Sequence, residues 1–102
     1  MQNFRTFNLA VEFYRETRTL KLSRQLKDQL DRAASSIALN LAEGSGRSSR
    51  KEQKRFFDIA FGSLRESQAI LLLVEQDSQL TAKADILAAH LYKLIQAVKR
   101  EL

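Results

Sequence analysis

The chemistry that this sequence could support is concentrated in a run of basic residues near the middle of the chain. Its members are Arg47, Arg50, Lys51, Lys54 and Arg55. They come at the start of an expected helix, where free backbone N–H groups and cationic side chains together suit phosphate groups. The same cations oppose the helix dipole, so we expect Glu43 or an anionic partner to compensate for them. The residue types leave two interpretations open: a phosphate-binding surface, or a solvated helix end.

The overall charge also favours an anionic partner. The 102 residues carry 17 Lys/Arg against 12 Asp/Glu, a net charge of +5. Residues 1–55 carry 12 basic and 6 acidic side chains, whereas residues 56–102 carry 5 and 6. We therefore expect RNA or another nucleic acid, bound through its phosphates in a salt-sensitive way. The basic run has no aromatic stacking platform, so base-specific readout of single strands is not expected.

A second group of polar residues is expected to be structural. It comprises Arg32, Ser36, Asn40 and Glu43, at steps of four, four and three, with Glu66 further on. These positions lie beside an apolar stripe, and buried charges need partners. We expect Arg32 to meet Glu66. Glu43 is expected to meet Lys51 or Lys54.

The alternative for this group is a ligand or catalytic pocket in which Glu43 and Glu66 act as acid and base. The two carboxylates are 23 positions apart on opposite arms of an expected hairpin, near different ends of it. We therefore expect a structural network that fixes the register of two helices, and no enzymatic activity.

Metal and cofactor chemistry is not expected. The sequence has no cysteine, and the single histidine, His90, has no metal ligand among its neighbours three or four positions away. Gly44-Ser45-Gly46 is followed by basic residues but lacks the G-x-x-x-x-G-K-[ST] pattern of a phosphate-binding loop, and it follows an expected helix rather than a strand. We predict no metal site and no cofactor.

The elements that position these residues are predicted to be four helices, over 8–18, 24–43, 50–76 and the segment after Thr81. Apolar residues recur at steps of three and four, and the absence of proline allows long helices. Ser23 is a plausible N-cap, and Ser49 with Glu52 fits a capping box. Residues 77–79 are expected to end the third helix. Short connections then predict an all-α, antiparallel up-down-up-down four-helix bundle.

Residues 32–67 are expected to form the central hairpin of this bundle. Gly44-Ser45-Gly46 should break the first arm, because glycine reaches the left-handed C-cap conformation at little cost. Gly62 and Ser63 should lie opposite Ala33 and Ala34, where small residues let the two helix axes approach closely.

The third helix has more apolar residues than one buried stripe requires. We expect a second face, formed by Phe57, Phe61, Leu64 and Leu72, to be covered by another subunit, because monomers seldom keep large apolar patches exposed. A wide intramolecular core is the alternative explanation.

Length and composition predict one domain, residues 1–102. The first residues lack the basic start and apolar run of a signal peptide. The longest apolar run, residues 70–74, is too short to cross a bilayer. We expect a cytoplasmic protein that does not interact with membranes.

The hairpin also resembles a known family. The run from Arg32 to Gly44, followed by Phe56, Ala60, Gly62-Ser63 and Glu66, is similar in order and spacing to the four-helix bundle proteins encoded in intervening sequences of bacterial 23S ribosomal RNA. The resemblance covers most of the chain and is strongest over 30–67. It implies a ring of five subunits and carries no catalytic assignment. A more distant similarity joins it to the accessory proteins of diversity-generating retroelements, which work with a reverse transcriptase and RNA.

Two functions follow as hypotheses. In the first, the protein is a non-catalytic homo-oligomer associated with RNA or another nucleic acid through the basic run. In the second, it is an adaptor whose ring docks a partner protein, such as a nucleic-acid enzyme, and the basic run recognises an acidic surface. Salt dependence separates the two, because phosphate binding weakens steeply with salt.

Overall fold

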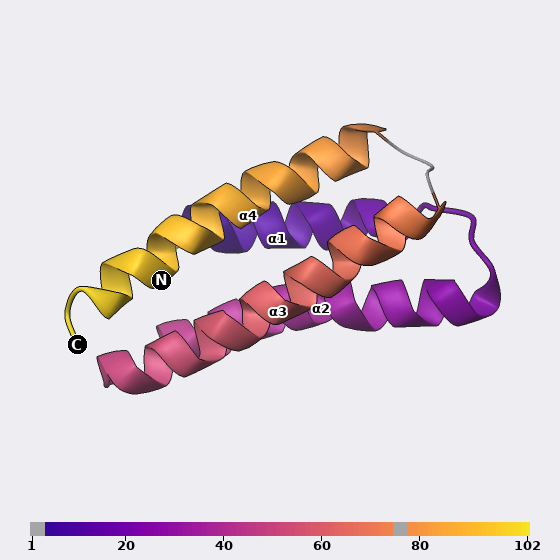
Figure 1. The fold of residues 1–102 in the computed structure, drawn as a ribbon. Helices are drawn as coiled ribbons and strands as arrows, with labels where there is room; N and C mark the ends of the chain where they lie inside the picture. Colours follow the sequence, from indigo (N-terminus) through magenta and orange to yellow (C-terminus); the bar gives the residue numbers. More distant parts are fainter. Residues whose placement is uncertain (1–3, 75–77) are drawn as a thin grey trace.

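The fold is built from helices alone. The structure, a computed structural model, describes residues 4–74 and 78–102, and contains no strand within them. The helices are α1 (Phe4–Thr17), α2 (Arg24–Ser45), α3 (Arg50–Val74) and α4 (Ser78–Lys99). Each helix lies back alongside the one before it, and α1 also packs against α4 (Figure 1). The prediction of an all-α protein with four helices is confirmed.

The ends of the helices differ in places from those expected. Ser23 does cap α2, because its hydroxyl accepts a hydrogen bond from the N–H of Leu26 at 3.3 Å. Helix α1 begins at Phe4, four residues before the expected start. Helix α4 begins at Ser78, so the expected cap at Thr81 and the expected non-helical positions 78 and 79 are wrong. The predicted end of the third helix at position 76, and position 77, lie outside the described residues.

The connection between α2 and α3 was expected to use a left-handed glycine, and this is wrong. Gly44 and Ser45 belong to α2, and the capping residue Gly46 has φ −87° and ψ −4°, which is right-handed. Its N–H donates to the carbonyl oxygen of Glu43 at 3.2 Å. On the other side of the turn, the Ser49 hydroxyl accepts from the N–H of Glu52 at 3.1 Å, which is one half of the predicted capping box.

The core takes large apolar side chains from all four helices. Those almost wholly buried are Phe13, Leu30, Ile37, Leu41, Phe57, Leu64, Leu80, Leu87 and Leu91. The expectation that another subunit covers Phe57 and Leu64 is therefore wrong, because both already pack inside their own bundle. Helical periodicity found the apolar positions but did not tell which neighbour each one faces. Of the four expected interface residues, Leu72 is 75% exposed and Phe61 is half-buried.

Two polar contacts fasten α1 to its neighbours. The Lys27 ammonium of α2 donates to the carbonyl oxygens of Arg18 at 2.7 Å and Thr17 at 3.4 Å, so it caps the C-terminal end of α1. The Lys83 ammonium of α4 binds the Glu16 carboxylate of α1. These contacts fix the N-terminal helix against both of the helices beside it.

A hydroxyl pair joins α2 to α3. The Ser63 hydroxyl donates to the Ser36 hydroxyl at 2.8 Å, and the Asn40 side-chain amide donates to the same oxygen at 3.0 Å. The Ser67 hydroxyl adds a bond to the backbone oxygen of Ser63 at 3.0 Å. Ser36 and Asn40 therefore belong to a network that joins the two helices, and its member on α3 is Ser63 rather than the expected Glu66.

The charged members of the predicted network behave differently. Arg32 and Glu66 are both exposed, and neither forms an ion pair within residues 4–74 and 78–102. Glu43 pairs with Arg47 at 2.7 Å rather than with Lys51 or Lys54. These pairings were wrong because the spacing placed the charged residues too close to the core. They lie further round the helices, in solvent.

Gly44 and Gly62 differ in whether their surroundings leave room for a side chain. A Cβ on Gly44 would lie 2.7 Å from Cε1 and 2.9 Å from Cδ1 of Phe57, so only glycine allows this ring to pack under α2. A Cβ on Gly62 would meet nothing within 4 Å. Gly62 is exposed, and the expectation that it faces Ala33 and Ala34 is wrong.

These two glycines give a matched pair of variants. Gly44→Ala should destabilise the fold by about 1–3 kcal/mol, because overpacking at the Phe57 ring outweighs the better helix propensity of alanine. Gly62→Ala should stabilise it by up to about 1 kcal/mol, since the new methyl meets no neighbour. Urea unfolding monitored by circular dichroism measures both. Equal effects at the two positions would contradict the close contact at Gly44.

The hydroxyl pair is tested by a double-mutant cycle. Ser36→Ala and Ser63→Ala should each cost about 0.5–1.5 kcal/mol, and the double variant should cost less than their sum, because the two share one hydrogen bond. Ser35→Ala is the control: its hydroxyl bonds only within α2, to the carbonyl of Arg32. Strict additivity of the two changes in unfolding free energy would show that the pair contributes nothing.

Candidate nucleic-acid interface

One end of the bundle brings together four segments of the chain. The start of α1, the end of α2, the start of α3 and the end of α4 all lie there (Figure 1). The guanidinium of Arg50 joins the carboxylate of Glu101, Nε to Oε2, at 3.3 Å, and so ties the start of α3 to the turn that follows α4. The basic run predicted from the sequence is on this end, which we call the basic end and define as residues 4–8, 39–58 and 92–102.

The basic end carries the entire charge excess of the protein. Its residues include nine Lys/Arg and four Asp/Glu, a net charge of +5, which equals the net charge of the whole chain. The remaining residues have eight of each sign. The fold therefore concentrates positive charge at one end of the bundle. Such a surface attracts polyanions that come within about one Debye length of it.

Four of the five residues in the basic run are already paired with carboxylates. Arg47 binds Glu43 at 2.7 Å and Arg50 binds Glu101. Lys54 binds Asp58 at 2.7 Å, and Arg55 lies 3.8 Å from Glu52. These carboxylates supply the compensation that the helix dipole requires. They also lower the net positive charge that the run presents to a ligand.

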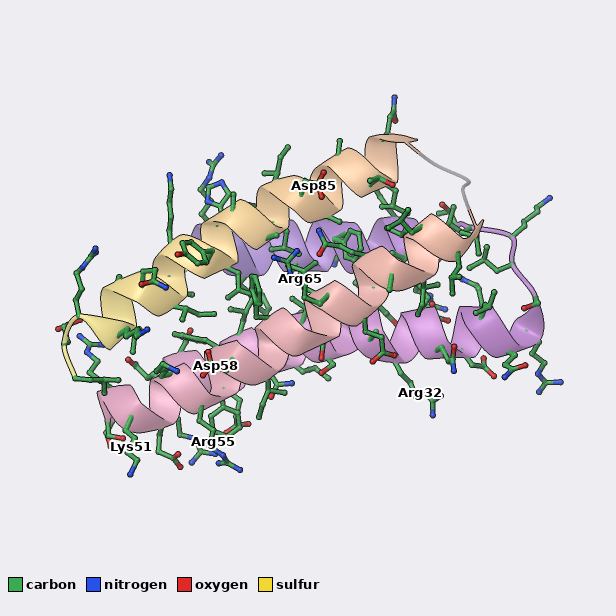
Figure 2. All side chains as sticks on the ribbon, in the orientation of Figure 1. Arg32, Lys51, Arg55, Asp58, Arg65 and Asp85 are labelled. Carbon is green, nitrogen blue, oxygen red and sulfur yellow. The ribbon has the colours of Figure 1, made fainter. Side chains whose placement is uncertain are left out.

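Lys51 is the exception in the run. Its side chain is exposed and makes no ion pair with any described residue. Figure 2 shows Lys51 and Arg55 extending away from the bundle at the start of α3. Lys51 is therefore the one member of the run whose charge is fully available to solvent.

An aromatic ring, that of Phe56, packs against two arginines of the run. The guanidinium carbons of Arg47 and Arg55 lie 4.9 and 5.3 Å from the ring centroid of Phe56. Such cation–π contacts hold the two guanidinium groups in place. The position of Phe56 directly after Arg55 in the sequence is the signal that could have predicted these contacts. The half-buried ring supports arginines rather than offering an open stacking surface.

Sequence reasoning missed the other basic residues at this end. They are Arg5, Lys93, Lys99 and Arg100, all exposed and without an ion pair in the described part of the chain. They belong to α1, to α4 and to the turn after α4, far from the run in sequence. The usable signal was the topology: in an antiparallel four-helix bundle, the start of the first helix and the end of the fourth lie at the same end of the bundle as the start of the third.

The two carboxylates of the alternative catalytic pocket are not brought together. Glu43 lies near the end of α2, at the basic end, and is held by Arg47. Glu66 lies 16 residues beyond Arg50, roughly 24 Å along α3 at a rise of about 1.5 Å per residue. The two groups therefore cannot act on the same substrate atom within one chain.

Other kinds of site were also considered. Within the described ranges, no three His, Asp or Glu side chains are grouped so that they could hold a metal ion. No helix of the described chain is long and apolar enough to cross a membrane. Shallow hollows do occur on the surface, and one lies between α3 and α4 beside Leu72.

Comparison with known proteins agrees with the fold. Among curated proteins, none matches this sequence. A family model described as "23S rRNA-intervening sequence protein" matches residues 4–102, which includes all four helices and the hairpin of residues 32–67. The chain therefore belongs to the 23S rRNA-intervening sequence protein family.

Proposed function

We propose that this protein is a non-catalytic homo-oligomer that associates with RNA or another nucleic acid through the basic end of its bundle. One observation carries the proposal: the fold collects the whole net charge of +5 on one end, and the rest of the molecule is balanced. Binding would go through phosphates, because Lys and Arg neutralise the backbone and release its counterions. The family name refers to 23S rRNA, so structured RNA is the first ligand to test.

The proposal includes self-assembly, for which exposed apolar side chains are the support. Leu72 and Leu73 of α3 are 75% and 74% exposed, and Ile59 on the same helix is 42% exposed. Monomeric proteins seldom leave neighbouring large apolar side chains in water. A ring of five subunits is the arrangement that the family resemblance implies. Each subunit would add one basic end, so modest single contacts would be strengthened by avidity.

A second candidate function is an adaptor that docks a partner protein, such as a nucleic-acid enzyme, without touching nucleic acid itself. It is favoured by the α3–α4 surface, where the Arg65 guanidinium lies 4.7 Å from the Phe61 ring centroid and Arg65 lines the same hollow as exposed Leu72. Arginine and aromatic residues are enriched at protein interfaces. In this case the basic end would recognise an acidic surface.

Nucleic-acid binding is tested by a salt titration of the purified protein with a hairpin RNA and a DNA duplex. The affinity should fall by orders of magnitude between about 50 and 200 mM salt, because each phosphate contact releases a counterion. The variant Lys51→Glu/Lys54→Glu/Arg55→Glu should bind much more weakly. Absence of binding at low salt would overturn the proposal and favour the adaptor.

Self-assembly is tested by the molar mass in solution. Leu72→Asp should yield smaller species than the wild type in sedimentation equilibrium, because a carboxylate buried at an interface without a partner is costly. Leu39→Asp is the matched control: this leucine is also exposed, at 67%, but lies on α2. A wild-type protein that stays monomeric at assay concentrations would refute the proposed assembly.

A further inference from the structure

We propose that the phosphate contacts are made mainly by Lys51, Lys99 and Arg100, at the corner where α3 begins and α4 ends, and not by the rest of the basic run. This inference rests on the proposed function and identifies the residues that carry it. It assigns binding to two residues, Lys99 and Arg100, that lie more than forty positions from the run in sequence.

The first argument is the distribution of carboxylates at the basic end. Its four acidic residues are Glu43, Glu52, Asp58 and Glu101, and each is paired with a member of the basic run. No carboxylate of this end remains for the other five cations, which are Arg5, Lys51, Lys93, Lys99 and Arg100. The net charge of +5 is therefore carried by the residues outside those pairs.

The second argument is the cost of making a contact. A phosphate that approaches Lys54 or Arg55 meets the carboxylate that already neutralises the cation, and it must displace or tolerate that negative charge. A phosphate that approaches Lys51 or Lys99 exchanges only water and counterions. Because like charges repel while opposite charges attract with similar strength, a paired cation presents little net field to an anion.

The third argument is geometry. The Arg50–Glu101 ion pair, at 3.3 Å, holds the start of α3 against the turn after α4. Lys51 follows one partner in sequence and Arg100 precedes the other, so the pair holds the two segments that carry them at the same corner of the bundle. The Arg50 guanidinium also donates to the side-chain oxygen of Gln53 at 2.7 Å. Arg50 is therefore a positioning residue for the corner.

The end of α4 is itself ordered. The backbone N–H groups of Arg100, Glu101 and Leu102 donate to the carbonyls of Gln96, Val98 and Lys99 at 3.0–3.2 Å. These bonds occupy carbonyl oxygens that would otherwise repel an anion at a helix C-terminus. The side chains of Lys99 and Arg100 are thus presented from a defined turn, close to the helix end where cations are favoured.

The ligand class that fits the corner is the phosphodiester backbone of a nucleic acid. Three exposed cations, from the start of α3, the end of α4 and the turn after it, present several point charges that a run of regularly spaced phosphates can bind together. The bundle measures 21 by 19 Å in the two directions perpendicular to its long axis. Each strand of a duplex places one phosphate in about every 3.4 Å of helix axis, so several would lie within that width.

The test compares two triple variants with the same change in net charge. Lys51→Gln/Lys99→Gln/Arg100→Gln alters the corner, and Arg47→Gln/Lys54→Gln/Arg55→Gln alters paired residues of the run. The probes are an RNA hairpin and a single strand of the same composition. The corner variant should reduce the magnitude of the slope of log affinity against log salt by about 2–3 on the hairpin, at about 0.7–0.9 per lost phosphate contact. The run variant should change this slope by less than the loss of a single phosphate contact would.

The outcomes separate the two proposals. If the wild type binds and the run variant loses as much slope as the corner variant, the corner assignment is wrong and the proposed function stands. If the wild type binds neither probe at low salt, the proposed function fails and the corner assignment fails with it. Circular dichroism and the urea midpoint check that both variants remain folded. The hairpin and single-strand arms show which form of the backbone is preferred.

Discussion

The contact between Gly44 and the ring of Phe57 is the constraint on which the rest of the structure depends. The ring packs against the backbone of α2 where any Cβ would lie within 3.0 Å of it, and the ring itself is fully buried. This close approach sets the distance between α2 and α3. At that distance, the Ser36 and Ser63 hydroxyls can meet, and the start of α3 stands beside the end of α2. The basic end is a consequence of the same packing.

The balance of charge at the basic end explains how such a surface remains compatible with folding. Cations in the first turns of a helix oppose its dipole. Here each unfavourably placed cation of the run, apart from Lys51, is matched by a carboxylate one turn away or across the end of the bundle. Exposed pairs of this kind contribute about 0–1 kcal/mol each. Their main effect is to neutralise four cations of the run, so that the positive charge of the basic end remains on its unpaired residues.

Much of the fold follows from the sequence, because steps of three and four specify helices wherever glycine and proline do not interrupt them. Four helices, the Ser23 cap and a polar stripe containing Ser36 and Asn40 were predictable from spacing, whereas Ser63 as the partner of Ser36 was not. The helix against which each apolar face packs was not predictable. Phe57 and Leu64 were assigned to an interface with another subunit, because periodicity shows which side of a helix is apolar but does not identify the helix that covers that side. Only part of the basic end was predictable. The clustering of basic residues along the sequence identified Lys51, whereas Lys99 and Arg100 lie near it only because α3 packs against α4.

The arrangement of the chain ends has a practical consequence for anyone handling the protein. Residues 4 and 102 both lie at the basic end (Figure 1). A purification tag or fluorophore attached at either terminus would therefore stand beside the surface where polyanions are expected, and a charged tag would alter its potential directly. The exposed connection between α1 and α2, around Thr19 and Lys21 at the opposite end of the bundle, is the better place for a label.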